Sequence, residues 1–223
     1  MWIKVCANTN LEDARLAADL GARALGFVFA KSSRQVTPAT VAAITAQLPD
    51  HVERVGVFAI SDAEQILRTV DQAGLTGVQL HGALSLELIQ QLHRARPNLT
   101  LIQTLHWDTT PGAPSPINTL REQLHLLENR PSVQRILIDS RIGNASGGTG
   151  ITFDWNAASE LFRSELGNRQ LIAAGGLRPE NVSEAILRLA PWGVDVATGV
   201  ERSPGKKDPE KLKAFLRKAS LSN

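Results

Sequence analysis

The chain has 223 residues, of which 43% are hydrophobic and 21% charged, and 24 Lys and Arg against 22 Asp and Glu leave a formal net charge of +2. This length suffices for one large hydrophobic core and falls within the range of compact α/β barrels. The near balance of charge argues against a protein that binds nucleic acid or a membrane surface. The single cysteine excludes an internal disulfide and a paired-cysteine metal site, and no apolar run is long enough to cross a membrane.

Short apolar runs alternate with amphipathic segments along the chain. The runs are near-continuous rather than alternating, as expected for strands of a parallel sheet that is covered on both faces. They recur at roughly the spacing of βα units. The predicted strands are Ile3–Cys6, Ala24–Phe29, Val55–Ala59, Gly77–Leu80, Leu99–Leu105, Ile136–Ile138, Leu171–Ala174 and Val194–Ala197.

The segments between these strands carry signals of helix starts. Thr37–Pro38, Arg178–Pro179 and Asp208–Pro209 each place proline at a first helical position. Ser61 and Glu64 have the spacing of a capping box. Apolar residues repeat at helical spacing in three of the predicted helices, namely Ala63, Ile66, Leu67 and Val70; Val182, Ala185, Ile186 and Leu189; and Leu212, Phe215, Leu216 and Ala219.

Eight strand–helix units can form either a closed barrel or an open doubly wound sheet. No GxGxxG motif follows the first strand, which weakens the dinucleotide-binding form of the open sheet. A closed barrel accounts for eight units directly. We therefore predict an α/β fold, a (β/α)8 TIM barrel, as a single domain over residues 1–223. The Pro-rich segment Trp107–Ile117 is predicted as a long loop, and Asp154 as the cap of the sixth helix.

In a barrel of this kind, the active site lies at the carboxyl ends of the strands and in the loops that follow them. A cysteine there can act as a base only as its thiolate, and an aspartate can act as an acid only if its pKa is raised. An arginine fork suits a carboxylate or a phosphate. Each residue also has a structural interpretation: a buried small hydrophobe, a turn cap, a surface charge or a packed ring. The residues selected after the first, second, fourth and sixth strands are Cys6, Arg34, His81 and Asp139.

Two glycine-containing turns follow the seventh and eighth predicted strands, at Gly175–Gly176 and Thr198–Gly199. Glycine lets the backbone approach an anion closely, and barrels often bind phosphate after these two strands. These residues are therefore candidate phosphate ligands, although a tight turn alone would also use glycine. The GGTG run at 147–150 is either a flexible loop over the substrate or a second phosphate contact.

The candidate residues lie in segments that resemble the phosphoribosylanthranilate isomerase family of tryptophan biosynthesis along nearly the whole chain. The order and spacing of these segments over eight strands make the match specific. The segments are KVCANTN (4–10), GFVFAKSSRQVTP (26–38), RVGVF (54–58), VQLHG (78–82), LIDS (137–140), GGTGITFDW (147–155), AAGGLRPENV (173–182) and VDVATGVERSPGKKD (194–208).

The resemblance implies an Amadori rearrangement of N-(5-phosphoribosyl)anthranilate to 1-(2-carboxyphenylamino)-1-deoxyribulose 5-phosphate. It implies that Asp139 is the general acid that opens the sugar ring and Cys6 the general base that removes the proton from C2. Arg34 is expected to hold the anthranilate carboxylate, and the backbone around Gly176 and Gly199 the phosphate. Because only protons move, we expect no metal and no cofactor.

Some positions depart from the family pattern. Ala7 and Asn8 stand where glycine and an aliphatic residue are usual, and Gln103 stands where lysine is common. Ala197 and Thr198 replace a motif richer in serine. None of these changes removes a proposed acid or base, so they bear on rate and substrate preference rather than on reaction class.

Three other interpretations fit the sequence less well. The related isomerase family of histidine biosynthesis has an aspartate where this chain has Cys6, and ribulose-phosphate epimerases need more metal-binding residues than His81 and Asp139. A non-catalytic phosphate-binding barrel would not need Cys6, Arg34 and Asp139 together.

We expect a cytoplasmic enzyme, since the opening MWIKVCANTN lacks a leader pattern. It should act on a phosphorylated small molecule, without nucleic-acid or membrane partners, as a monomer or homodimer.

Overall fold

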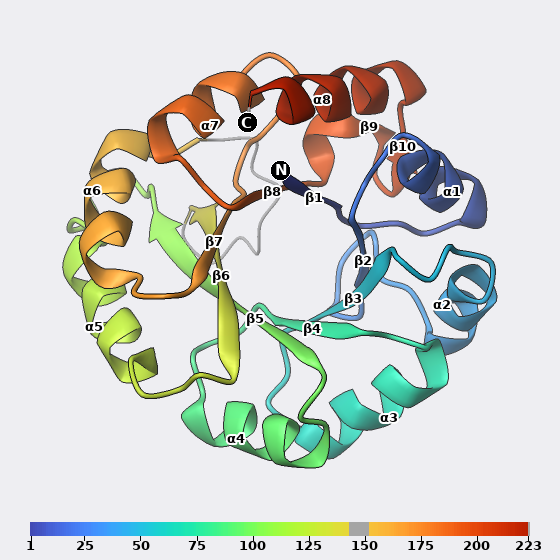
Figure 1. Ribbon diagram of the computed structural model, residues 1–223, viewed down its shortest axis with the longest axis horizontal. Coiled ribbons are helices and arrows are strands. Elements are labelled where there is room, and N and C mark those ends of the chain that lie inside the picture. Colours follow the sequence, from blue (N-terminus) through green and yellow to red (C-terminus); the bar gives the residue numbers. More distant parts are fainter. Residues whose placement is uncertain (143–151, 223) are drawn as a thin grey trace.

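The computed structural model describes residues 1–142 and 152–222. In this part of the chain, eight parallel strands close into a barrel in the order β1 to β8, with helices around the outside (Figure 1). The fold confirms the predicted (β/α)8 barrel. The strands are β1 Trp2–Val5, β2 Ala24–Val28, β3 Glu53–Phe58, β4 Gly77–Leu80, β5 Thr100–Asp108, β6 Val133–Arg141, β7 Gln170–Ala173 and β8 Gly193–Val196. The helices are α1 Leu11–Asp19, α2 Pro38–Thr45, α3 Ala63–Ala73, α4 Leu86–Ala95, α5 Ile117–Leu127, α6 Trp155–Glu165, α7 Val182–Leu189 and α8 Pro209–Leu221.

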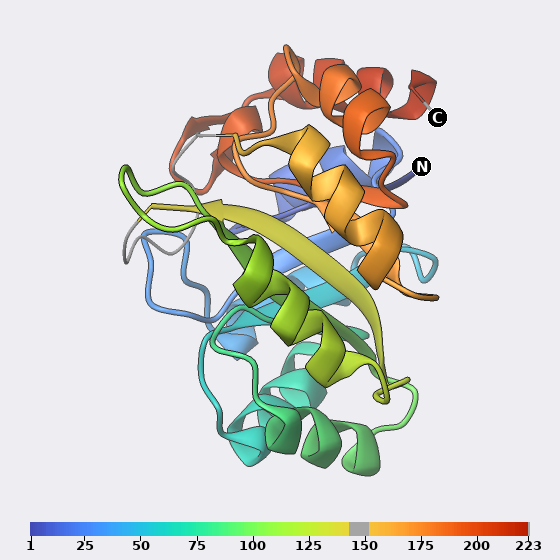
Figure 2. The ribbon, with the colours of Figure 1, turned by 90° about the vertical axis from the view of Figure 1, so that its left-hand side faces the viewer.

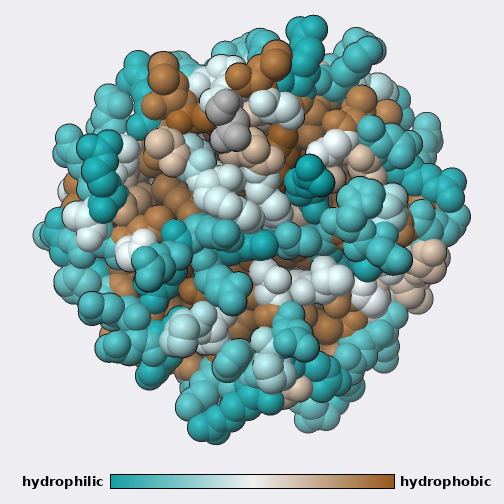
Figure 3. All heavy atoms as spheres, viewed as in Figure 1, coloured by the Kyte–Doolittle hydropathy of each residue, from teal (hydrophilic) through white to brown (hydrophobic). Residues whose placement is uncertain are grey.

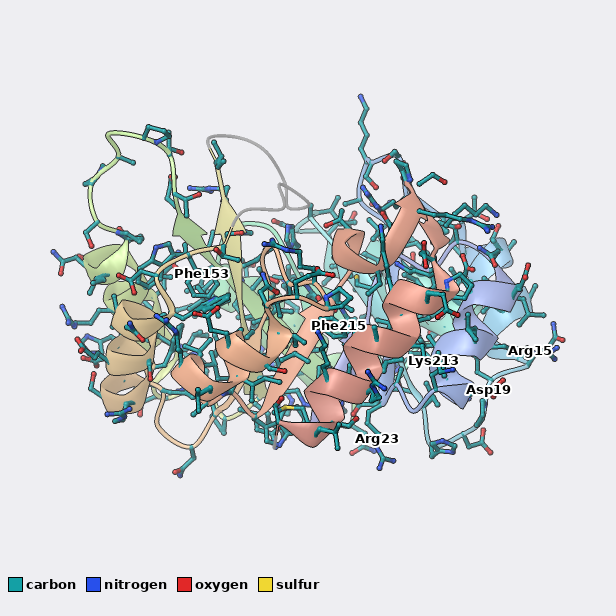
Figure 4. The ribbon with its side chains drawn as sticks, turned by 90° about the horizontal axis from the view of Figure 1, so that it is seen from above. Arg15, Asp19, Arg23, Phe153, Lys213 and Phe215 are labelled. Atoms are coloured by element: carbon teal, nitrogen blue, oxygen red, sulfur yellow. The ribbon has the colours of Figure 1, made fainter. Side chains whose placement is uncertain are left out.

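The outer helices bury the apolar stripes that the sequence predicts. On α7 and α8 all eight residues of the two stripes are buried, and on α3 Ile66 and Val70 are buried while Ala63 and Leu67 are partly so. Figure 4 shows Phe215 on α8, on the side of the barrel that this helix covers. No helix among the described residues is both long and apolar enough to span a membrane.

Three of the predicted helix starts are confirmed and two are wrong. Thr37, Asp154 and Asp208 cap α2, α6 and α8 through their side-chain oxygens. Helix α3 is capped by Asp62 rather than Ser61, because the Asp62 carboxylate accepts the bond from Gln65 N. Helix α7 begins at Val182, three residues after the predicted proline, since the Asn181 side chain holds residues 176–181 in a turn.

Strands β5 and β6 are longer than their apolar runs. Their backbones stay paired from Leu105 with Ile138 to Asp108 with Arg141, so polar residues continue both strands. The loop predicted at Trp107–Ile117 therefore shrinks to residues 109–116. Asp139 lies within β6, not after it.

The amino ends of the strands are closed by a cluster around Arg135 of β6. Its guanidinium lies 5.0 Å and 4.8 Å from the ring centroids of Trp2 and Trp192, which stack on each other at 5.2 Å. Both carboxylate oxygens of Glu53 accept hydrogen bonds from Arg135, at 2.5 Å and 3.1 Å. Figure 3 views this end of the molecule, where hydrophilic residues lie across the centre of the face.

We expect Glu53→Gln to lower the free energy of unfolding by about 1 kcal/mol, because the amide keeps the shape but loses the ion pair in a partly exposed site. Urea denaturation at neutral pH measures the change. Glu160→Gln, on an exposed face of α6, serves as the control and should leave the free energy unaltered. An equal effect of both substitutions would mean that the ion pair contributes nothing.

Candidate active site

A cavity of about 290 Å³ opens at the carboxyl ends of the strands. Figure 2 shows these ends on the left, with both chain termini on the right. All four side chains that the strand-end rule selects line this one cavity. They come from the residue after β1, the loop after β2, the residue after β4, and β6 itself. They are Cys6, Arg34, His81 and Asp139, and Gln79 and Asp195 join them.

Cys6 directly follows β1 and is fixed there by backbone contacts. Its N–H donates to Val196 O at 2.8 Å, and its carbonyl accepts a bond from Lys207 Nζ at 2.5 Å. Burial raises the pKa of the thiol, whereas the ammonium groups of Lys4 and Lys207 lower it and Asp195 raises it, leaving it above its usual value. The thiol is therefore largely protonated at neutral pH.

The two unusual residues after the thiol have separate structural effects. Ala7 adopts a left-handed backbone with φ 62°, which favours glycine. The Asn8 amide donates to the carbonyls of Val5 at 2.8 Å and Gly26 at 3.2 Å. Its amide nitrogen thus ties the end of β1 to β2. Ala7 strains the turn that holds Cys6, while Asn8 fixes it through these two bonds and leaves its own Oδ1 buried without a described partner.

Asp139 lines the same cavity from β6. Burial raises the pKa of its carboxyl to about 7, with a further increase from Asp195 that Lys4 and the Ser140 backbone N–H partly offset. A carboxyl with this pKa is about half protonated at neutral pH, so it can donate or accept a proton there.

Two charged residues that the sequence analysis missed lie beneath Cys6 and Asp139. Lys4 is fully buried, and its Nζ donates to both carboxylate oxygens of Asp195 at 3.0 Å. Each interrupts an otherwise apolar strand, Lys4 between Ile3 and Val5 and Asp195 between two valines. A charge inside an apolar run needs a buried partner, and that signal could have identified both.

Arg34 is held rigidly beside the cavity by Glu201. Its Nε donates to both Glu201 oxygens at 3.0 Å and its Nη2 to one of them at 2.7 Å. Glu201 also lies 3.4 Å from Lys207 Nζ. Burial raises the pKa of the Glu201 carboxyl, but Arg34 and Lys207 together lower it by more and leave it below its usual value. The sequence analysis found Arg34 but missed Glu201 and Lys207, which are far from it in the chain.

His81 lies where the cavity meets β4. Burial, with smaller effects from His106 and Lys4, lowers the pKa of its imidazole to about 4. The His106 ring meets it edge-on at 4.9 Å. His81 is therefore neutral at physiological pH and can accept or donate a hydrogen bond, but it carries no charge to offer an anion.

The two predicted glycine turns meet at one side of the site. Gly175 and Gly176 have positive φ values of 79° and 63°, and a side chain at Gly199 would overlap the Leu177 carbonyl. Thr198 and Gly199 begin a 3-10 turn, η1 (Thr198–Val200), whose first N–H groups have no partner within the turn. These loops line a small adjoining cavity whose described lining contains Asp139 and Asp195 but no Lys or Arg, so an anion there would depend on backbone N–H groups.

Two sequence predictions are not tested by the described residues. The GGTG run at 147–150 lies outside the described residues. Within the described ranges, no group of three His, Cys, Asp or Glu side chains is arranged to hold a metal ion; the absence of a metal and of a cofactor stays a prediction.

The family model of N-(5'phosphoribosyl)anthranilate (PRA) isomerase matches residues 3–218. The chain belongs to this family. A PRA isomerase of Gloeothece citriformis is 39% identical over 213 residues, covering 95% of this chain and 90% of that protein. The crystal structure of the Thermotoga maritima PRA isomerase has a TM-score of 0.84 at 35% identity, with 99% of both chains covered. Another PRA isomerase structure, in complex with reduced 1-(o-carboxyphenylamino)-1-deoxyribulose 5-phosphate, has a TM-score of 0.80 at 34% identity over 99% of both chains.

The left-handed backbone at Ala7 yields a stability prediction. Ala7→Gly should raise the free energy of unfolding by about 0.5–1 kcal/mol, because relief of the left-handed strain exceeds the extra freedom of glycine in the unfolded chain. Urea denaturation measures the difference. Ala17→Gly, at a buried position within α1, should lower stability instead; a loss of stability in both variants would contradict the assignment of strain to Ala7.

Proposed function

We propose that this protein is an N-(5'-phosphoribosyl)anthranilate isomerase that converts N-(5-phosphoribosyl)anthranilate to 1-(2-carboxyphenylamino)-1-deoxyribulose 5-phosphate in tryptophan biosynthesis. The observation that carries the proposal is a thiol and a carboxyl of raised pKa that face one cavity from β1 and β6, in a chain of this family. A relative bound to the reduced form of that ketose phosphate supports the choice of substrate.

The reaction begins with opening of the furanose ring. Protonated Asp139 donates its proton to the ring oxygen as the C1–O bond breaks, and the anthranilate nitrogen lone pair forms the C1=N bond of an iminium ion. The Cys6 thiolate then removes the proton from C2, and the C–H electrons form the C1=C2 bond of an enolamine. Loss of the C2 hydroxyl proton and protonation of C1 give the ketose, so no atom is gained or lost overall.

The first two steps require a particular distribution of protons. Asp139 must be protonated while Cys6 is deprotonated, although the pKa of Asp139 is about 7 and that of the thiol lies above its usual value. The productive state is therefore the less populated one between these two pKa values. Activity should accordingly reach its plateau between them and fall on both sides.

The other candidate residues would bind the substrate. Arg34 has Nε and Nη2 bonded to Glu201, and its Nη1 makes only a long contact of 3.5 Å with Ser33 Oγ, so N–H groups of Nη1 and Nη2 would bind the anthranilate carboxylate. The backbone of Gly175, Gly176, Thr198 and Gly199 would receive the phosphate, and neutral His81 would contact the substrate from the β4 side. We expect the chain to act as a single domain, in the cytoplasm, as a monomer or homodimer, without metal or cofactor.

Turnover of phosphoribosylanthranilate, followed as loss of its fluorescence, tests the function. Cys6→Ser and Asp139→Asn should each lower kcat by about 10²–10⁴-fold, because each removes a proton-transfer group, while binding of a reduced product analogue changes little. Glu53→Gln, at the opposite end of the barrel, should keep normal kcat. Binding without turnover in the unmodified protein would identify a non-catalytic barrel, and normal kcat in either variant would remove that residue from the mechanism.

Arg34→Ala should raise KM by about 10–100-fold with a smaller change in kcat, because the lost contact binds substrate and transition state alike. Steady-state kinetics with two substrates measure this. N-(5-phosphoribosyl)aniline lacks the carboxylate, so the unmodified protein and the variant should convert it equally well. Arg163→Ala, on the exposed face of α6, is the control. An unchanged kcat/KM for the natural substrate would exclude Arg34 from the site.

A further inference from the structure

The buried ion pair between Lys4 and Asp195 is placed where the barrel closes. The register of β1 on β8 sets Lys4 directly against Asp195, and both carboxylate oxygens accept bonds from Nζ at 3.0 Å. A buried ion pair adds little net stability, since desolvation of the two charges offsets their attraction. We therefore explain the pair by its electrostatic effect on neighbouring groups rather than by stability.

Lys4 lies next to the thiol. Lys4 is on β1 and Cys6 is the first residue after that strand, two positions further on, and alternate residues of an extended chain point to the same side. Both side chains cover the same backbone position: a Cβ built at Gly26 would lie 2.6 Å from Cys6 Sγ and 3.0 Å from Lys4 Cε. The absence of a side chain at Gly26 thus leaves the space in which the ammonium and the thiol meet.

Asp195 lies next to the other reacting group. Ile138 of β6 pairs with Ala173 of β7, which pairs with Val194 of β8. Asp139 and Asp195 are the next residues along β6 and β8, and alternate strands of such a barrel supply one layer of inward side chains. Both carboxylates line the small cavity beside the glycine turns.

We propose that Lys4 and Asp195 are positioning residues that shift one proton from Cys6 to Asp139, with the cation stabilising the thiolate and the anion stabilising the protonated carboxyl. Lys4 acts on the Cys6 thiol through a hydrogen bond and its charge, and Asp195 acts on the Asp139 carboxyl through its charge. The inference rests on the proposed function, which requires this distribution of protons.

The balance of the charges agrees with this arrangement. The effect of Lys4 on the pKa of Cys6 is larger than the opposing effect of Asp195, whereas the effect of Asp195 on the pKa of Asp139 is larger than that of Lys4. Among the described residues, the other charged or titratable groups around Cys6 and Asp139 are Lys31, Arg34, His81, Glu201 and Lys207, which the test leaves unchanged.

The composition of the chain allows the thiol to be titrated directly. Cys6 is the only cysteine, and the chain contains no tyrosine, so the ultraviolet absorbance of a thiolate is not masked by tyrosinate. The unmodified protein would be compared with Lys4→Met, Asp195→Asn and the double variant, with Cys6→Ser as the blank. The double variant leaves no unpaired buried charge, so it should fold even where a single variant does not.

Each variant has a distinct expected signature. Lys4→Met should raise the pKa of the thiol by about one unit or more, and Asp195→Asn should lower it. In the double variant the thiol pKa should rise, while the lower limb of the pH dependence of kcat/KM, which follows Asp139, should move to lower pH. The plateau of kcat/KM should fall about tenfold for each unit by which the pKa values of Cys6 and Asp139 move further apart.

Glu53→Gln breaks the ion pair at the other end of the barrel and controls for loss of stability alone. A thiol titration in the double variant that matches this control would overturn the inference, as would movement of both limbs in the same direction. These outcomes are distinct from failure of the proposed function. A protein that does not convert phosphoribosylanthranilate would refute the function, while the absorbance titration would still decide whether the pair acts on Cys6.

Discussion

The pairing of β1 with β8 is the contact on which the rest of the molecule depends. It converts an open sheet into a barrel, and with it the carboxyl ends of all eight strands meet around one cavity. The same pairing lays Lys4 against Asp195 and gives Cys6 N–H its acceptor on Val196. Each of these charges would be costly to bury alone. The strand pairing that closes the barrel therefore also brings the polar residues of the site together.

The two ends of the barrel solve different physical problems. At the amino end, the Arg135 guanidinium packs against two indole rings and forms an ion pair with a carboxylate, so its charge is neutralised and its planar group is packed. At the carboxyl end, the charges are offset only in part, and the pKa of Asp139 stays near 7. Among the described residues, a left-handed backbone outside glycine occurs at both ends, at Ala7 beside the cavity and at Ala190 before β8. Chemistry and stability are thus provided by separate groups of residues.

The sequence was a good guide to whatever depends on local pattern and a poor one to whatever depends on register. Apolar runs located the strands, and the strand-end rule brought Cys6, Arg34, His81 and Asp139 into one cavity. Strands β5 and β6 outran their apolar runs because backbone pairing continues through polar residues. Lys4 and Asp195 are 191 residues apart, and Arg34 and Glu201 are 167 apart. Only the order of strands in space shows that these charges meet.

The buried, protonated state of Cys6 also bears on how the protein ages. Hydrogen peroxide reacts with thiolates, not with thiols, so a site that keeps the thiol protonated is oxidised slowly. The chain has no second cysteine that could trap a sulfenic acid as an internal disulfide. Recovery of a sulfenic acid at this sulfur would therefore depend on a thiol from outside the chain. The burial that keeps the Cys6 thiolate a minor form thus also protects the sulfur from oxidation.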